Sequence, residues 1–275
     1  MRDLILKDEP VSQLDAKSRH EEFRLAYSGG IIVGYRTGKV VSNTSECAAL
    51  IYRTIQKMQF EDEGYEIIIG SDEAGKGEWL GPLTVAAVAL TPQQSKHLRA
   101  LGIMDSKDLP RHRIAQKAQD IVGYCESKHV LVISPHKFNN MFADFRAESK
   151  NLNDILAWAH SKAVSEIYEL VKQNFADSDI QIVVDEFARV KTRKRMSQVF
   201  DLSEIRLVQK HGAEETMAVA AASILARDAY ELWLTRNSDK LSIDLRSMSQ
   251  SQIRARDDTT KLAKIEYFDD RKQDA

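Results

Sequence analysis

Two adjacent carboxylates, Asp72 and Glu73, follow a short apolar run at residues 67–69 and precede a loop rich in glycine. Adjacent residues of a strand point to opposite faces, so each carboxylate needs its own partner. A buried carboxylate without a partner is very costly, and paired carboxylates at a strand end suit a hard divalent cation that also binds phosphate. A polar turn that contains Asp and Glu is the alternative for this stretch alone.

Residues 70–77, GSDEAGKG, also match the spacing of a phosphate-binding P-loop, G-x-x-x-x-G-K. Gly77 stands where that loop needs Ser or Thr, and the two carboxylates would repel the phosphate. The following Gly81-Pro82 is incompatible with the helix that a P-loop requires. We therefore disfavour nucleotide binding and expect no nucleotide cofactor.

Further acidic residues stand at the ends of other predicted elements. Asp185 ends an apolar strand, as Asp72 does, and Glu214 and Glu215 precede a helix at residues 217–236. The small residues that open this helix let its backbone approach a neighbour closely. Taken singly, each acidic position is explained as an ordinary surface residue. Three such positions at strand or helix ends together favour a site for two divalent cations.

The order of the predicted elements indicates a mixed sheet packed against helices. The strands fall at 67–69, 84–90, 130–134, 180–185 and 205–208, and the helices at 92–101, 111–126, 152–174, 192–200 and 217–236. The helix at 152–174 has a continuous apolar stripe, so we interpret it as scaffold and His160, beside that stripe, as a structural residue.

Residues 1–62 are predicted to form a small separate unit, which a charged linker joins to a larger unit at 66–275. Two short strands, a hairpin turn and a helix at 45–58 are predicted there. Tyr35 and Lys39 on the hairpin could bind nucleic acid by stacking and charge, although an ordinary solvated hairpin also explains them.

Composition and charge limit the class of protein to which this chain can belong. The 275 residues are 43% hydrophobic and 29% charged, as in ordinary globular proteins, and no apolar run approaches the ~20 residues of a membrane span. No secretory leader is recognisable, so we expect a cytoplasmic protein. The two cysteines have no zinc-site spacing. With a net charge of −2, phosphate binding requires a local basic patch, and the densest, at 189–195, contains Arg193 and Lys194.

Several motifs together resemble the type 2 ribonuclease H family. They are GSDEAGKG at 70–77 with Gly81-Pro82, DSK at 105–107, the strand that ends at Asp185, and AAASILAR at 220–227, in that order. The segment 151–153 with His160, the small N-terminal unit and a final Glu resemble ribonuclease HIII more than ribonuclease HII. The resemblance implies an α/β fold with a ribonuclease-H-like mixed sheet flanked by helices. It also implies an N-terminal α+β domain that is similar to the TATA-binding-protein fold and binds the substrate.

The resemblance also implies an activity and its residues. The activity is endonucleolytic hydrolysis of the RNA strand of RNA/DNA hybrids, leaving 3′-hydroxyl and 5′-phosphate ends, with Mg²⁺ or Mn²⁺. The implied acidic set is Asp72, Glu73, Asp185 and Glu214, with Glu215 as the rival of Glu214. The implied substrate contacts are those of Gly75, Lys76 and Gly77 with ribose hydroxyls and of Ser106 and Lys107 with a phosphate.

Some positions depart from the family pattern and leave alternatives open. Lys76 stands where ribonucleases HII usually have Arg and ribonucleases HIII often Thr, and the segment after Arg236 is atypical of ribonuclease HIII. The alternatives are ribonuclease HII-like incision at single ribonucleotides in DNA and a catalytically silent nucleic-acid-binding protein of the same fold. We expect a monomer.

Overall fold

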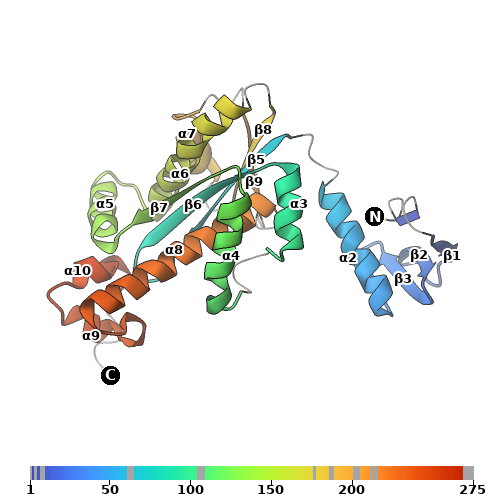
Figure 1. Ribbon diagram of the computed structural model, residues 1–275, viewed down its shortest axis with the longest axis horizontal. Coiled ribbons are helices and arrows are strands. Elements are labelled where there is room, and N and C mark those ends of the chain that lie inside the picture. Colours follow the sequence, from blue (N-terminus) through green and yellow to red (C-terminus); the bar gives the residue numbers. More distant parts are fainter. Residues whose placement is uncertain are drawn as a thin grey trace. The chain divides into compact units, whose positions relative to one another are not determined.

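The chain divides into two compact units, Met1–Gly64 and Tyr65–Ala275. The computed structural model describes residues 2, 5–6, 10–60, 65–103, 109–175, 178–185, 189–200, 205–210, 213 and 216–268 (Figure 1). Each unit has its own sheet and its own hydrophobic core. The two units are therefore described separately.

The first unit is an antiparallel sheet with one long helix. Its strands, in the spatial order β1-β2-β3-β4, are β1 (Ser12–Leu14), β2 (Glu21–Tyr27), β3 (Gly30–Tyr35) and β4 (Val40–Ser42), and its helix is α2 (Ser45–Phe60). The expected hairpin connects β3 to β4: the amide of Gly38 donates to the carbonyl of Tyr35, and φ is +84° at this glycine. The core contains Phe23, Leu25 and Ile32 from the strands and Leu50 from the helix.

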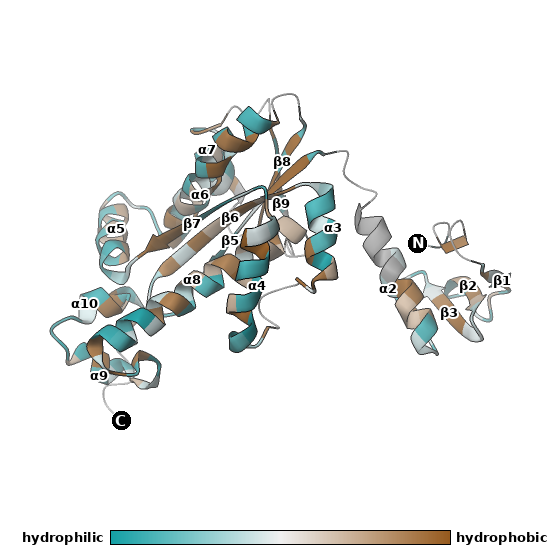
Figure 2. Ribbon diagram, in the orientation of Figure 1, coloured by the Kyte–Doolittle hydropathy of each residue, from teal (hydrophilic) through white to brown (hydrophobic). Residues whose placement is uncertain are grey.

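The second unit contains a mixed sheet of five strands. They are β5 (Ile67–Ala74), β6 (Leu83–Leu90), β7 (Ser127–Ile133), β8 (Ile180–Asp185) and β9 (Arg206–Lys210), in the spatial order β7-β6-β5-β8-β9. β5 pairs antiparallel with β6 and parallel with β8, and β8 pairs parallel with β9. Figure 2 shows hydrophobic residues along β5 to β8, whereas the helices alternate between hydrophobic and polar residues.

Helices cover both faces of this sheet (Figure 1). The helical elements are α3 (Pro92–Ala100), α4 (Arg111–Tyr124), α5 (Pro135–Ala147), α6 (Leu152–Asn174), α7 (Arg189–Met196), α8 (Met217–Leu241), η3 (Leu245–Ser247), α9 (Gln250–Arg254), α10 (Thr259–Leu262) and η4 (Ile265–Tyr267). On β6, Val85 and Ala87 pack with α6, whereas Ala86 and Val88 pack with α3, α4 and α8. The strand is thus buried on both faces.

Helix α8 lies directly against β5 because the side chains on both facing surfaces are small. A Cβ atom at Gly70 would lie 2.2 Å from the backbone nitrogen of Val219 and 2.3 Å from the carbonyl carbon of Ala218. The expected close approach of this alanine-rich helix is therefore confirmed. It brings the first turns of α8 to the end of β5 that carries Asp72.

The predicted fold class is confirmed, and several element boundaries differ. β5 does not stop before the two carboxylates but continues through them to Ala74, since it pairs with β6 as far as Ala74 opposite Thr84. α7 begins at Arg189 rather than at residue 192, so the basic run is helical. The short strand β1, α5 and the helical turns after α8 were not predicted.

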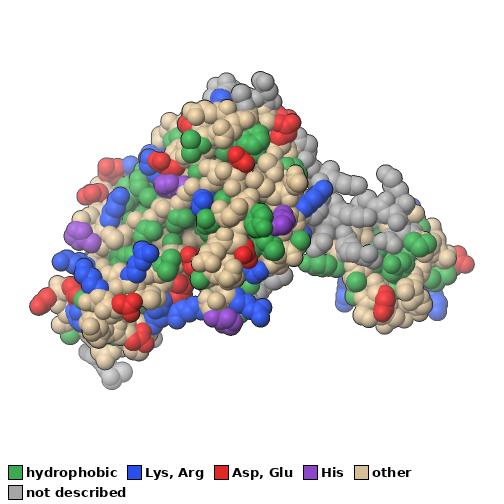
Figure 3. Space-filling view, in the orientation of Figure 1, with side chains coloured by type: hydrophobic (Ala, Val, Ile, Leu, Met, Phe, Trp, Pro, Cys, Tyr) green, Lys and Arg blue, Asp and Glu red, His purple; other side chains and the backbone are tan. Residues whose placement is uncertain are grey.

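The surface and the helices agree with the composition. The face seen in Figure 3 carries both acidic and basic side chains, as expected for a chain of net charge −2. Across the described residues, none of the helices combines the length and the apolar character that crossing a membrane requires.

The contact at Gly70 can be tested by Gly70→Ala. The added methyl group would meet backbone atoms that cannot rotate away, so β5 and α8 must separate. We expect the free energy of unfolding to fall by about 3 kcal/mol or more. Urea denaturation followed by circular dichroism measures this change.

Gly123→Ala on α4 is the matched control. In the part of the chain that the structure describes, no atom lies within 4 Å of the added Cβ there, and a helical glycine is less favourable than alanine. This control should leave stability unchanged or raise it by about 1 kcal/mol. Equal, small effects at both glycines would contradict the close contact between β5 and α8.

Candidate active site

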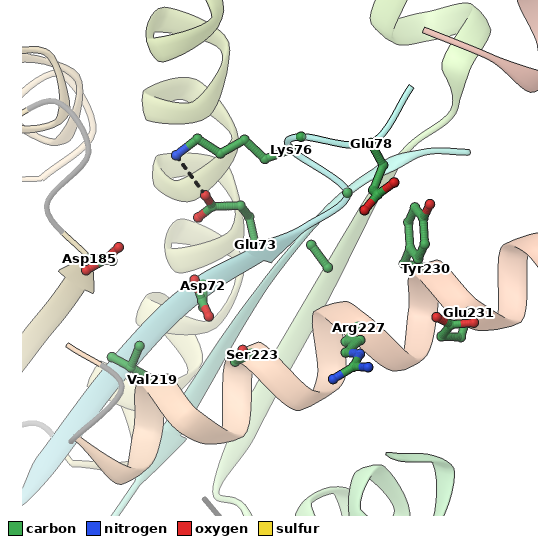
Figure 4. Close-up of a pocket in the computed structure, with 13 residues that line it drawn as sticks. Asp72, Glu73, Lys76, Glu78, Asp185, Val219, Ser223, Arg227, Tyr230 and Glu231 are labelled. Atoms are coloured by element: carbon green, nitrogen blue, oxygen red, sulfur yellow. Dashed lines mark ion pairs between the residues drawn. The ribbon is translucent and has the colours of Figure 1, made fainter. Parts of the chain in front are cut away.

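The register of two parallel strands brings Asp72 and Asp185 to one edge of the sheet. Ser71 on β5 pairs with Val184 on β8, and one residue further along each strand come Asp72 and Asp185. Figure 4 shows Asp185 at the end of β8, on the same side of the pocket as Asp72. The two predicted carboxylates thus reach one site because their strands are neighbours and run in the same direction.

Asp72 lies on the face of β5 that packs against α8. Its cross-strand partner Ala86 belongs to the core on that face. The pKa of Asp72 is raised, because its carboxyl is buried and because Glu73 is negatively charged beside it; a hydrogen bond with Ser223 of α8 opposes both effects. A nearby cation would offset the same repulsion.

Glu73 points to the opposite face and has different partners. His160 of α6 lies there, with its Nε2 atom 3.1 Å from Oε2 of Glu73, and Lys76 Nζ is 3.2 Å from Oε1. Burial alone would raise the pKa of Glu73, but the hydrogen bond and charge of His160 and the charge of Lys76 outweigh it, so this pKa is lowered. Glu73 is therefore held ionised.

His160 is fully buried and also contacts the strand itself. Its Nδ1 atom is 2.7 Å from the hydroxyl oxygen of Ser71, and this hydroxyl donates to the carbonyl of Ala86 at 2.9 Å. His160 thus connects α6 to β5 and orients the Glu73 carboxylate. It is a structural residue, as the sequence suggested, but one with a direct contact to a site carboxylate.

The glycine loop after β5 combines a constrained glycine with an open one. Gly75 has φ +80°, and a Cβ there would lie 2.3 Å from the carbonyl oxygen of Pro82. A Cβ at Gly77 would meet no atom of the described residues within 4 Å. Gly75 is therefore required by the fold, whereas Gly77 leaves open space at the pocket.

One pocket of about 580 Å³ is lined by Asp72, Glu73, Asp185 and the loop residues 74–77. It also contains side chains that were not predicted as site residues: Glu78 from the loop, and Val219, Ser223, Arg227, Tyr230 and Glu231 from α8 (Figure 4). The available sequence signal was the spacing of Ser223, Arg227 and Tyr230, which recur every three or four residues and share one face of a helix.

The other predicted site residues lie elsewhere or outside the described residues. Four of them lie outside the described residues: Ser106, Lys107, Glu214 and Glu215. Arg193 and Lys194 are exposed on α7. Tyr35 and Lys39 flank the hairpin of the first unit, where the amide of Tyr35 donates to the carbonyl of Lys39 at 2.8 Å.

The donor set fits a hard divalent cation. Asp72, Glu73 and Asp185 offer carboxylate oxygens to the pocket, and the described residues that line it include no thiol or imidazole. Within the described part of the chain, no three or more His, Cys, Asp or Glu side chains are close enough together to enclose an ion. An ion bound here would therefore need additional oxygen ligands, such as a substrate phosphate or water.

The orientation of Glu73 by His160 can be tested with His160→Leu. Leucine removes both polar contacts and leaves Ser71 and Glu73 without this partner. We expect the free energy of unfolding to fall by about 1–3 kcal/mol. The pKa of Glu73 should rise, because the donor that favours its charged form is gone; carbon-13 NMR titration of glutamate carboxyls measures it.

His160→Gln is the control, since its amide keeps a donor for Glu73 and should recover part of both effects. The pH dependence has a fixed sign. The folded pKa of Glu73 lies below its unfolded value of about 4.3, so the stabilisation is complete above that value and is lost as the pH falls through the folded pKa. An unchanged pKa in His160→Leu would contradict this role.

Comparison with known proteins identifies relatives of this chain. The family model described as Ribonuclease HII matches residues 69–265. Ribonuclease HIII of Protochlamydia amoebophila (strain UWE25) is 35% identical over 232 residues, which cover 79% of this chain and 71% of that protein. Ribonuclease HIII of Chlamydia trachomatis serovar D is 37% identical over 163 residues, which cover 59% of this chain and 51% of that protein.

A solved structure has the same architecture. The crystal structure of Bst-RNase HIII in complex with Mn²⁺ matches with a TM-score of 0.67 at 22% identity, covering 96% of this chain and 92% of that one. This likeness shows the fold, and the family model covers most of the second unit. The chain therefore belongs to the type 2 ribonuclease H family, and the relatives named above are ribonucleases HIII.

Proposed function

We propose that this endoribonuclease hydrolyses the RNA strand of RNA/DNA hybrids to 3′-hydroxyl and 5′-phosphate ends, with Mg²⁺ or Mn²⁺ bound at the edge of the sheet. The observation that supports this most is the register of β5 and β8, which sets Asp72 beside Asp185 in one pocket with Glu73. Family membership supports the ribonuclease H reaction.

The acidic residues would hold two cations. Asp72 and Asp185 lie at the centre of the proposed set, and Glu73 and Glu214, or Glu215 in its place, complete it. When bound, such a pair supplies Lewis acidity that activates the attacking water and offsets the charge of the leaving 3′ oxygen. The protein orients these ligands: Ser223 holds Asp72, and His160 holds Glu73 in its ionised form.

The glycine loop is proposed to recognise the ribose. Gly77 faces open space at the pocket, so backbone groups of Gly75, Lys76 and Gly77 can approach a 2′-hydroxyl, the group that distinguishes RNA from DNA. Ser106 and Lys107 would bind a phosphate of the same strand.

Contacts away from the pocket would hold the duplex. Arg193 and Lys194 are exposed on α7, which follows Asp185 in the chain, and can contact backbone phosphates. Tyr35 and Lys39 of the first unit are proposed to bind the hybrid as well, by stacking and charge.

We propose cleavage within runs of ribonucleotides, as the resemblance to ribonuclease HIII implies, and not ribonuclease HII-like incision at single ones. The name ribonuclease HIII of the relatives described above supports this choice. We propose that the enzyme acts as a monomer in the cytoplasm, because one chain supplies the whole proposed site and hybrids form where DNA is copied and transcribed.

Asp72→Asn and Asp185→Asn test the metal site. Each amide keeps the side-chain volume but removes a charge that binds the cation, so we expect cleavage to fall by at least about a hundredfold. The assay is cleavage of an end-labelled RNA/DNA hybrid in Mg²⁺ and in Mn²⁺, with binding of the hybrid measured in parallel. A native protein that binds the hybrid but leaves it intact with both metals would replace this proposal with the binding-protein alternative.

Gly77→Ala tests the contact with the sugar. The methyl group has room in the fold, so the melting temperature should stay within about 2 °C of native. It would occupy the space that the ribose approaches, and kcat/KM for the hybrid should fall about tenfold or more. Native kcat/KM in this variant would place the 2′-hydroxyl contact elsewhere.

A further inference from the structure

A lysine in the C-terminal segment is fully buried and takes no part in the proposed chemistry. Lys264 follows α10 and has 0% of its surface exposed. Lysine is almost never fully buried unless its charge is paired. Burial lowers the pKa of Lys264 to about 7, although the charge of Glu78 opposes this shift.

The partners of the Lys264 ammonium group belong to the turn that follows the glycine loop. Nζ donates to the carbonyl of Gly81 at 2.7 Å and to that of Pro82 at 3.2 Å. The rings of Phe138 and Tyr267 lie 5.8 and 6.0 Å from the same nitrogen. Two carbonyls and two aromatic rings thus surround the charge, and both carbonyls come from one turn.

The backbone of the same segment contacts that turn as well. The amide of Lys264 donates to the carbonyl of Trp79 at 2.7 Å, and the amide of Gly81 donates to the carbonyl of Leu262 at 2.9 Å. Leu80 and Ala263 form an isolated antiparallel bridge between them. Residues 262–264, here called the C-terminal clasp, therefore bind residues 79–82 through backbone and side chain together.

The turn held by the clasp is in contact with the glycine loop. The carbonyl oxygen of Pro82, an acceptor for Lys264, lies 2.3 Å from the position that a Cβ of Gly75 would take. The loop is closed by the amide of Glu78, which donates to the carbonyl of Gly75 at 3.3 Å. The Pro82 carbonyl bound by Lys264 therefore packs directly against Gly75.

Helix α8 anchors the same segment at other points. The hydroxyl of Tyr230 donates to the carbonyl of Leu80 at 3.0 Å. Thr84 contacts the carbonyls of Ala74 and Ala226 at 3.2 and 2.8 Å. The Tyr230 ring also packs against Gly75 and Gly81. The loop and turn are thus held from α8 as well as by the Lys264 side chain, which binds the carbonyls of Gly81 and Pro82.

We propose that Lys264 is a positioning residue, which fixes the Gly75–Gly77 loop in the conformation that contacts the substrate ribose. The proposal rests on the proposed function of that loop. An apolar side chain of similar volume would fill the same space without the desolvation cost of an ammonium group. What only the lysine amine supplies is a pair of hydrogen bonds to the two carbonyls, which are charge-assisted when the amine is protonated.

The clasp can be tested without any activity measurement. Lys264→Met keeps an unbranched side chain that is one heavy atom shorter and removes its donors. We expect the Glu78 and Gly81 amides to exchange with solvent at least about tenfold faster, measured by NMR hydrogen exchange of the full-length protein. The matched control is Ile253→Ala, a buried residue of the same C-terminal core, which should lower the melting temperature without selectively exposing these amides.

Kinetics on the RNA/DNA hybrid test the consequence. Lys264→Met should lower kcat/KM about tenfold to a hundredfold, because a displaced loop no longer holds the ribose in line with the carboxylates. Ile253→Ala should retain near-native kcat/KM after an equal or larger loss of stability. Lys264→Gln, which keeps a neutral donor, should fall between native and Lys264→Met, and it replaces the methionine variant if that protein does not fold.

The outcomes separate this inference from the proposed function. Native-like exchange of the Glu78 and Gly81 amides together with native kcat/KM in Lys264→Met would overturn the positioning role. Equal losses of kcat/KM in Lys264→Met and Ile253→Ala would also overturn it, because the effect of Lys264 would then be a general loss of stability. A native enzyme that leaves the hybrid intact would refute the proposed function, while the exchange measurement would still decide whether Lys264 holds the loop.

Discussion

The placement of like charges at the ends of two parallel strands is the constraint on which the second unit depends. β5 and β8 are in register, so Asp72 and Asp185 meet at one edge of the sheet, and Glu73 follows directly. Such carboxylates repel each other and lose hydration. The fold offsets this cost on both faces of β5, with Ser223 of α8 beside Asp72 and His160 of α6 beside Glu73.

This arrangement requires the two covering helices to approach the strand closely. On one face, the absence of a side chain at Gly70 allows the backbone of α8 to contact β5, which brings Ser223 within reach of the site. On the other face, buried His160 crosses from α6 to Ser71 and Glu73. The hydrophobic core and the polar site therefore share the same contacts, and a change that separates a helix from β5 also alters a carboxylate.

The glycine loop depends on parts of the chain that are distant in sequence. Tyr230 and Lys264 contact the turn at residues 79–82 from α8 and from the C-terminal segment. A loop held in this way before substrate binds need not be ordered by the substrate, which leaves more of the binding energy for the reaction. The C-terminal segment thereby has a role at the site although none of its described residues lines the pocket.

The sequence by itself determined most of the strands and helices of the five-stranded unit, and it predicted Asp72, Glu73 and Asp185 as a candidate set. It could do so because apolar runs and the charges that end them are local signals. It missed α5 even though Phe138, Met141, Phe142 and Phe145 recur there at helical spacing, and it ended β5 too early because charges interrupt the apolar run. The partners of His160 and Lys264 were decided only by the tertiary structure. Their contacts join residues 87 and 183 positions apart, and no local pattern of side chains specifies which distant carbonyl or carboxylate a buried cationic or imidazole group will meet.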